Sequence, residues 1–308
     1  MGIAHYRVML LLRPFMAFPS FLLIPLACAV LYVLGMLMLK RASELGVGIW
    51  RATIIANWAG ALLFLPWWLW HGWAPVDWVD YWQPAVSALV FFVAQVLVFL
   101  AITRGDVSVA TPVLGTKVIF VTCFSALLLT DDIPWQWWVG AGLSTMAVGL
   151  LNLGPAPQHR LVRQTIFLAL GGSLTFGLCD VLVQRWAPAW GPGNYFPPYF
   201  MLVGIYSFGL LKFARGGLKG MSGKAWMWVL PGALLNALNN AGIGITLGVW
   251  GQATAVNIVY SSRGLFSVLL VWLAGHWFAN TEREAGGGAF AARALGAVAM
   301  IAAIAMVL

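Results

Sequence analysis

Long runs of apolar residues fill almost the whole chain, and short polar or turn-forming segments separate them. A bilayer core of about 30 Å requires roughly 20 apolar residues in one helix, and the runs have about this length. Very little of the 308-residue sequence remains between them. The pattern predicts ten transmembrane helices, over residues 18–39, 48–70, 84–103, 107–129, 135–153, 165–186, 196–213, 226–247, 253–278 and 290–308.

The composition agrees with a membrane protein. Hydrophobic residues make up 62% of the chain and charged residues 8%, whereas soluble domains carry about 25% charged residues. The net charge of +8 comes from basic residues scattered between apolar runs, so it predicts membrane orientation rather than nucleic-acid binding. Cys28, Cys123 and Cys179 each lie in an apolar run without CxxC spacing, and we expect them to be buried apolar groups.

Part of the sequence is repeated after 146 residues. The segment GDVSVATPVLGTK, which starts at Gly105, aligns without a gap with GQATAVNIVYSSR, which starts at Gly251. Lys117 then aligns with Arg263. A basic residue twelve positions after a loop glycine in both segments indicates two related halves.

The repeat predicts an all-α integral membrane protein in which residues 1–157 and 158–308 each form a five-helix unit. LKRA at Leu39 resembles VQRWA at Val183 with a similar shift, in agreement with this division. Five helices are an odd number, so the second half must enter the membrane from the opposite side. We therefore expect the two repeats to be inverted.

The basic residues of the loops are distributed unequally between the two sides of the membrane. Because cytoplasmic loops are enriched in Lys and Arg, the richer side is predicted to be cytoplasmic and both termini external. The cytoplasmic set is Lys40, Arg41, Arg51, Arg104, Arg160, Arg163, Lys212, Arg215, Lys219, Lys224, Arg283 and Arg293, and the external set is Arg7, Arg13 and Arg185.

Lys117 and Arg263 are basic residues deep inside apolar runs. Each lies about ten residues into its helix, roughly 15 Å from the membrane surface, which is too far for a lysine stem to reach the headgroups. A charge at this depth costs about 2.5–3.5 kcal/mol on insertion scales. Because the halves are inverted, both residues are expected near the midplane, where transporter sites lie. We predict that they bind an anionic group of a substrate.

Asp180 is the only carboxylate predicted deep inside an apolar run, and Met36 is its equivalent in the first half. Two roles stay open: Asp180 neutralises Lys117 or Arg263, or it carries a proton during coupling. Two cations and one carboxylate leave one positive charge, which favours a carboxylate or a phosphate on the substrate.

Several polar residues near these positions are expected to complete the site, with hydrogen bonding between helices as the alternative role of each. Asn236 and Asn240 lie with Asn239 on one face of the eighth run. Asn57 in the second run is interpreted as a packing residue. The other polar residues that flank the same region are Gln95, Thr111, Thr116, Asn257, Tyr260, Ser261 and Ser262, and of these Tyr260, Gln95, Thr116 and Ser262 are predicted to bind substrate.

Motifs of enzymes and ATP-driven pumps are missing from the sequence. The segment GLKGMSGKA lacks the glycine spacing of a phosphate-binding loop, and no HExxH or GxSxG occurs. The four histidines lie far apart. We therefore expect no catalytic residues, no metal site and no cofactor.

The segment ATPVLGTKVIFVTCFSALLLTDDIPWQWWVGAGLSTMAVGLL, which starts at Ala110, runs from a helix through an acidic turn to a Gly-rich helix. Together with the two five-helix halves, this order resembles the drug/metabolite transporter superfamily in its ten-helix EamA-like branch. The resemblance implies a secondary transporter of a bacterial cytoplasmic (inner) membrane, whose central cavity is lined mainly by helices 1–4 and 6–9.

The same resemblance bears on the deep cations. Related plastid sugar-phosphate translocators use basic residues of their fourth and ninth helices for phosphate, and Lys117 and Arg263 occupy similar places. Four-helix multidrug exporters need a glutamate in the first helix, and residues 18–39 contain no carboxylate. Cation–proton antiport of the multidrug type is therefore not expected.

Three functions remain open from the sequence. The first is secondary active transport of a small organic metabolite with an anionic group, by alternating access. The second is export of amino acids or apolar drugs with a structural Lys/Arg pair, and the third is a lipid flippase or scramblase. The expected partners are a small-molecule substrate and the bilayer, without nucleic acid, and a homodimer and a monomer would have the same composition.

Overall fold

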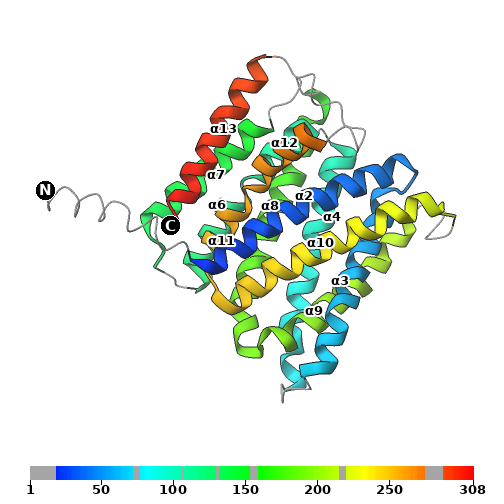
Figure 1. Cartoon of the computed structure of the whole chain (residues 1–308). Coiled ribbons are helices and arrows are strands. Elements are labelled where there is room, and N and C mark those ends of the chain that lie inside the picture. The colour runs from blue at the N-terminus through cyan, green and yellow to red at the C-terminus, as the bar shows by residue number, and fades with distance from the viewer. Residues whose placement is uncertain are drawn as a thin grey trace, which may run out of the picture.

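The computed structural model describes residues 19–71, 77–105, 107–129, 132–152, 159–214, 220–274 and 287–308, and all regular structure in these ranges is helical (Figure 1). The α-helices are α2 (Leu23–Glu44), α3 (Ile49–His71), α4 (Trp82–Arg104), α5 (Val107–Leu114), α6 (Lys117–Phe124), α7 (Trp135–Leu151), α8 (His159–Trp190), α9 (Pro192–Ser207), α10 (Gly223–Trp250), α11 (Ala253–Tyr260), α12 (Arg263–Ala274) and α13 (Gly287–Ala305). Short 3₁₀ segments are η2 (Ser20–Leu22), η3 (Trp78–Tyr81) and η5 (Phe208–Lys212), and η4 (Ser125–Leu129) is π-helical.

The all-helical fold expected from the sequence is confirmed, and each of the ten apolar runs contains helical residues. The fourth run is divided into α5, α6 and η4, and the ninth into α11 and α12. Within the described ranges, six helical stretches are long and apolar enough to cross a membrane: Ser20–Glu44, Ile49–Trp68, Trp78–Arg104, Val109–Leu129, Val162–Trp190 and Ala253–Leu270. Ten crossings in inverted halves stay a prediction, and Arg7 and Arg13 lie outside the described residues.

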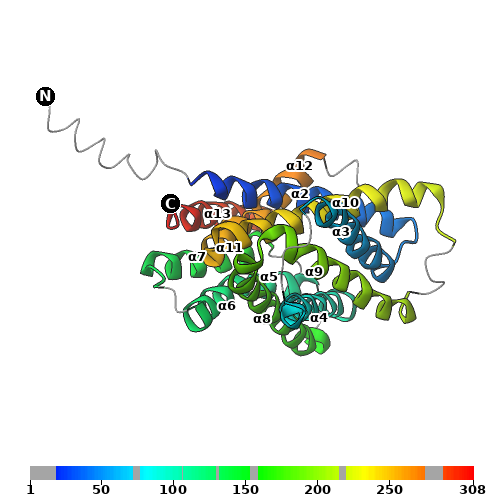
Figure 2. The same cartoon turned by 90° about the horizontal axis from the view of Figure 1, so that it is seen from below.

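The helices are arranged in two layers. Seen from below, α2, α10, α12 and α13 form one layer, and α4, α6, α7 and α8 form the other (Figure 2). The most extensive contacts join α2 to α10, α4 to α8, α7 to α13 and α3 to α9. In the sequence repeat, α2 corresponds to α8 and α10 to α4, so the first two contacts are equivalent. The contact of α3 with α10 likewise corresponds to that of α9 with α4.

Two glycines allow α2 and α10 to approach closely. A Cβ atom at Gly232 would lie 3.1 Å from the Gly35 carbonyl oxygen and 3.0 Å from the Leu39 side chain. A Cβ atom at Gly35 would lie 2.6 Å from the Asn236 Nδ2 atom. Small residues at helix crossings are typical of membrane proteins, where close van der Waals contact drives association. Gly35 also leaves the space that the Asn236 side chain occupies.

The fourth run is interrupted by a tight turn at Gly115 and Thr116. Each backbone N–H of this pair bonds to the carbonyl three residues earlier, at 3.0 Å, instead of four residues earlier. Pro112 precedes the turn and lacks an N–H group. The Thr145 hydroxyl donates to the Gly115 carbonyl at 3.1 Å, and the Ser173 hydroxyl donates to two carbonyls at the end of α5 at 3.3 and 3.4 Å. Side chains of neighbouring helices therefore satisfy backbone groups that the interruption frees.

The ninth run is interrupted in the same place. Ser261 and Ser262 form the turn, and the Ser262 N–H bonds to the Val259 carbonyl oxygen, three residues back, at 3.1 Å. A shift of 146 residues superimposes this turn on the one in the fourth run. Lys117 and Arg263 are each the first residue after the interruption, so both basic side chains lie at the start of a new helical segment.

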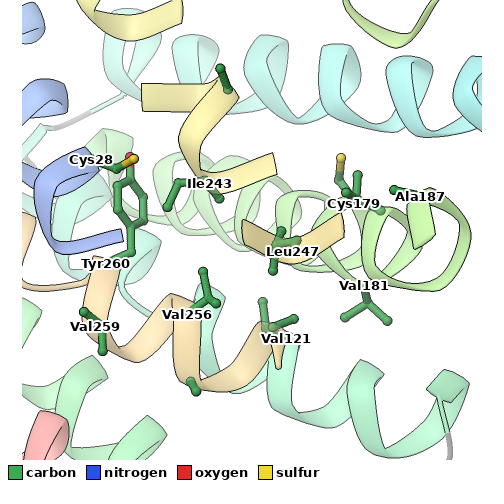
Figure 3. Packing of buried hydrophobic residues seen from close by; sticks show 14 of the residues in the cluster. Cys28, Val121, Cys179, Val181, Ala187, Ile243, Leu247, Val256, Val259 and Tyr260 are labelled. Carbon is green, nitrogen blue, oxygen red and sulfur yellow. The ribbon is translucent and has the colours of Figure 1, made fainter. Parts of the chain in front are cut away.

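The largest buried apolar cluster contains residues of α2, α6, α8, α9, α10 and α11, and Figure 3 shows a part of it. Val121 of α6, Leu247 of α10 and Val256 of α11 belong to it, with exposed fractions of 0, 1 and 0%. Cys28 and Cys179 are buried there as free thiols, in agreement with the sequence interpretation, whereas Cys123 is only partly buried. Leu247 of this cluster lines the central cavity, and Ala253 of the same cluster lines a second cavity.

Candidate substrate-binding site

A central cavity of about 360 Å³ lies between the two layers of helices. Lys117 of α6, Asp180 of α8 and Arg263 of α12 all line it. Three ionisable groups that the sequence placed in separate apolar runs therefore share one space. The volume lies within the range of small-molecule sites, about 300–1,000 Å³.

Most of the predicted polar residues also line the central cavity, namely Asn236, Asn240, Tyr260 and Gln95. Thr116 and Ser262 are not among its lining residues. The Thr116 hydroxyl donates to the Val113 carbonyl oxygen at 2.7 Å, and Ser262 is 1% exposed. Thr116 and Ser262 belong to the turns that interrupt their helices. They are therefore next to Lys117 and Arg263 in the sequence, but their side chains do not line the cavity.

Other lining residues were not predicted. Asn57, interpreted from sequence as a packing residue, exchanges two hydrogen bonds with Gln95, each of 3.0 Å. Tyr32 and Phe176 also line the cavity, and Asn239 does so together with Asn236 and Asn240, with which the sequence grouped it. A polar side chain in the middle of an apolar run was the available signal for Asn57. Nothing in the local sequence distinguishes these aromatic residues from others that face lipid.

Lys117 and Asp180 form an ion pair across α6 and α8. The Lys117 Nζ atom lies 2.7 Å from Asp180 Oδ2, and the two side chains are 14% and 12% exposed. The Asn257 amide donates to the same oxygen at 2.7 Å. Asp180 thus neutralises Lys117 and joins three helices.

Among the described residues, no cluster of three His, Cys, Asp or Glu side chains could hold a metal ion.

Each deep cation is covered by an aromatic ring from the opposite half. Lys117 Nζ lies 5.7 Å from the centre of the Phe176 ring, and Arg263 Cζ lies 5.0 Å from the centre of the Tyr32 ring. The Tyr260 ring flanks the same guanidinium at 4.7 Å. Phe176 and Tyr32 are equivalent when the sixth run is placed on the first with a shift of 144 residues. Cation–π attraction therefore supports both cations in corresponding ways.

The correspondence between the two halves does not extend to the Asp180 carboxylate. The counterpart of Asp180 is Met36, which also lines the cavity but carries no charge. In the described part of the chain, Arg263 makes no ion pair with a carboxylate, although Lys117 does. The unbalanced positive charge deep in the cavity therefore lies at Arg263, while the exposed Lys40 adds a second cation near the end of α2.

The side chain of Asn239 fixes one of the two rings beside Arg263. With its amide nitrogen turned toward them, Asn239 donates to the Tyr260 hydroxyl at 3.1 Å and to the Cys28 carbonyl oxygen at 3.0 Å. Tyr260 is 6% exposed, and the Tyr32 ring meets it edge to face at 6.2 Å. The aromatic groups around the guanidinium are consequently held by their own contacts, independently of any ligand.

The two ends of the central cavity differ. At one end its lining includes Lys40 and Ser43 near the end of α2, on the side predicted to be cytoplasmic. At the other end the lining includes Phe196 and Phe200. Phe64 stacks on Phe200 with a centroid distance of 4.8 Å, and these three rings are 3% exposed or less. Lys40 and Ser43 thus place a cation and a hydroxyl at one end of the cavity, and packed rings bound the other end.

Comparison with known proteins agrees with a membrane transporter. Residues 19–153 match the model of the EamA-like transporter family, as the sequence resemblance predicted. A solved crystal structure of a protein superimposes with a TM-score of 0.72 at 18% sequence identity, over 93% of this chain and 97% of that one. No curated protein matches the chain in sequence. The family match indicates a membrane transporter of small molecules, and the structural likeness shows a shared fold over almost the whole chain.

Proposed function

We propose, from the match to the EamA-like transporter family, that this protein is a secondary active transporter of a small organic metabolite with an anionic group. The observation that carries the proposal is the position of Arg263 in the central cavity without a carboxylate partner among the described residues. A buried cation is costly unless it is paired. An anionic group of the substrate would supply the missing partner.

Arg263 is better suited to this role than Lys117. The guanidinium presents five N–H donors in a planar fork that matches a carboxylate or a phosphate. The faces of Tyr32 and Tyr260 flank it at 5.0 and 4.7 Å. Lys117 has its charge neutralised by Asp180 at 2.7 Å. We therefore assign substrate binding to Arg263 and the internal ion pair to Lys117.

The remaining wall selects the body of the substrate. Phe91, Phe99, Val98 and Ile102 of α4 present apolar surface, while the Asn57–Gln95 pair and Asn240 present amides. Such a wall suits a mainly apolar molecule with one or two hydrogen-bonding groups. Deep in the cavity only Arg263 is uncompensated among the described residues, which favours one anionic group at that depth.

Transport by alternating access is part of the proposal. The equivalent helix contacts and the two corresponding interruptions support a pair of related halves that rock about a central site. The polar end near Lys40 and the packed rings at the other end suit a state open toward the cytoplasm. The opposite state would require the rings to separate.

Uptake into proteoliposomes tests the proposal with organic monocarboxylates, phosphate monoesters, amino acids and apolar amines as substrates. We expect Arg263→Gln to raise the half-saturating concentration of the anionic substrate by about ten- to a hundredfold, since a charge-assisted hydrogen bond contributes about 1.5–3 kcal/mol. Arg263→Lys should lie between Arg263→Gln and the unchanged protein.

Arg185→Gln is the matched control, because Arg185 is an exposed residue of α8 that bonds to the Leu128 carbonyl oxygen outside the central cavity. Normal anion transport by a folded Arg263→Gln variant would overturn the assignment. Uptake confined to amino acids or apolar amines would favour an exporter with a structural Lys/Arg pair. Exchange of labelled phospholipid between leaflets would favour a flippase.

A further inference from the structure

A second cavity, of about 440 Å³, lies at the end of the molecule that is predicted to face outward. It is formed by the first residue of η4, the last two turns of α8, the end of α10 and the beginnings of α7 and α11. Its lining includes Ser125, Asp132, Gln184, Gln252 and Thr254. None of these residues lines the central cavity, so this second cavity is a separate space.

Two buried hydroxyl groups of this cavity have no hydrogen-bond partner among the described protein atoms. They belong to Ser125 and Thr254, which are 2% and 1% exposed. Buried Thr122 and Thr246, on α6 and α10, donate instead to carbonyls of their own helices at 2.9 and 2.7 Å. An unsatisfied buried hydroxyl costs about 1–3 kcal/mol, and water usually supplies the missing bond. Water that reached the two hydroxyls would supply the missing hydrogen bonds.

The second cavity ends close to Asp180. Thr254 precedes Asn257 by three residues on α11, and Gln184 follows Asp180 by four residues on α8, so each step is about one helical turn of 5.4 Å. Asn257 bonds directly to the Asp180 carboxylate at 2.7 Å. Gln184 accepts a hydrogen bond from the Ala253 N–H at 2.6 Å, which ties α8 to the beginning of α11. Asp180 thus lies at the wall of the central cavity and about one turn inward from the second cavity.

Buried apolar side chains lie between residues that line the central cavity and residues that line the second cavity. Val121, Leu247 and Val256 fill the space between α6, α10 and α11 (Figure 3). Packed side chains of this kind block an organic solute. A proton needs only a chain of hydrogen-bonded groups, which the Thr254 hydroxyl and water can begin. The exposed carboxylate of Asp132 gives the outer rim a negative charge, which attracts cations.

We propose that the second cavity is the external proton pathway to Asp180, with Ser125 and Thr254 as the positions that hold its water. This inference rests on the transport function and orientation proposed above. A hydronium ion that arrives by this route forms an O–H bond on the Asp180 carboxylate and leaves water behind. Asp180 becomes neutral, and Lys117 keeps its charge and loses its ionic partner.

The groups facing the Asp180 carboxylate determine what its protonation does. They are Lys117 from α6, Arg263 from α12, Tyr199 from α9 and the adjacent Cys179, together with the amide of Asn257. Both charged neighbours are cations. Protonation of Asp180 therefore raises the charge of the cavity by one and strengthens its attraction for an anion. An anionic substrate and a proton are expected to bind together and to be transported in the same direction.

The test compares proton-driven uptake with counterflow in vesicles at equal pH on both sides. Thr254→Val and Ser125→Ala remove the hydroxyls with little change of shape. We expect each to slow uptake driven by an acidic exterior about tenfold, as the loss of roughly 1.4 kcal/mol would do, and to slow counterflow much less. Thr246→Val is the matched control, because its hydroxyl is bonded within its own helix, and it should behave like the unchanged protein in both assays.

A labelling experiment examines the pathway without using transport. Gln252→Cys, in a chain whose three cysteines are replaced by alanine, should react with a membrane-impermeant methanethiosulfonate added outside, because Gln252 is an exposed lining residue of the second cavity, and the buried Thr246→Cys should not. Full proton-driven uptake by both hydroxyl variants, dependence on a sodium gradient instead, or labelling of Gln252→Cys only from the cytoplasmic side would overturn the proposal. If the unchanged protein showed no counterflow at all, the proposed transport function itself would be contradicted.

Discussion

At the scale of single residues, one substitution between the two halves decides where the cavity carries its charge. Lys117 and Arg263 correspond, and so do the rings of Phe176 and Tyr32 that cover them. Only Asp180 has no acidic counterpart, because Met36 occupies the equivalent position. The Lys117–Asp180 contact of 2.7 Å realises one of the two roles that the sequence left open for Asp180, the neutralising one. The other role, proton transfer, stays a proposal.

Met36→Asp would give Arg263 the carboxylate that Lys117 already has. We expect this variant to bind the anionic substrate about tenfold more weakly or worse, because close charge pairs couple by about 1.5 kcal/mol or more. Equilibrium binding of a labelled organic anion to the purified protein measures the change. Met36→Asn is the control, since it has nearly the same shape as Met36→Asp without the charge and should bind the anion much more tightly. Equal affinity of the two variants would show that Arg263 does not hold the anion.

At the scale of helices, the two deep basic residues lie at interruptions of their helices and not within continuous spans. The turns at Gly115–Thr116 and Ser261–Ser262 end one helical segment directly before Lys117 and Arg263. Apolar periodicity predicts two unbroken runs there, because a two-residue turn barely alters the pattern of apolar positions. Pro112 lies in the first run, but the second interruption contains no proline. The hydroxyls of Thr145 and Ser173, which come from other helices, donate hydrogen bonds to backbone carbonyls at the first interruption.

The crossing of α2 and α10 depends on the absence of a side chain at Gly232. We expect Gly232→Val to lower the thermal unfolding midpoint in detergent by roughly 4–8 °C, because overpacking costs about 1–3 kcal/mol and the Gly35 carbonyl at 3.1 Å has little room to move. Gly142→Val on α7 is the control, since a Cβ atom there would meet nothing within 4 Å. A midpoint for Gly232→Val no lower than that for Gly142→Val would show that the contact tolerates a larger separation.

At the scale of the whole molecule, the proposed mechanism connects proton binding to anion binding through the two cavities and the Asp180 carboxylate between them. Linkage requires that, if a proton on Asp180 strengthens anion binding, a bound anion strengthens proton binding by the same factor. Because protonation removes a negative charge from a cavity that holds Lys117 and Arg263, anion affinity should rise as the pH falls. The direction of this change follows from the charges alone.

Asp180→Asn should remove that dependence on pH. The amide is permanently neutral, so we expect the variant to keep at every pH the higher anion affinity that the unchanged protein reaches only in acid, a difference of about tenfold. Binding of an organic sulfonate, which stays ionised in this range, avoids titration of the ligand itself. The variant should also fail to concentrate the sulfonate in response to a proton gradient. An affinity that still rises as the pH falls would exclude Asp180 as the proton site.

The sequence by itself determined the class of the protein and the positions of its deep charges. Long apolar runs can satisfy their backbone in a bilayer only as helices, so helical membrane structure followed from composition and run length. Charges inside such runs are costly and therefore rare, which is why Lys117, Arg263 and Asp180 are conspicuous in the sequence alone. The alignment of Lys117 with Arg263 needed only the order of residues.

Only the tertiary structure decided how these residues meet. The Lys117–Asp180 pair joins positions 63 residues apart, and the rings over the two cations come from the opposite half of the chain. The hydroxyls of Ser125 and Thr254 have no hydrogen-bond partner among the described residues, and this can be seen only when the positions of the neighbouring donors and acceptors are known. Pairing, burial and cavities depend on distances between segments that are remote in sequence. Local patterns of apolar and polar residues contain no such distances.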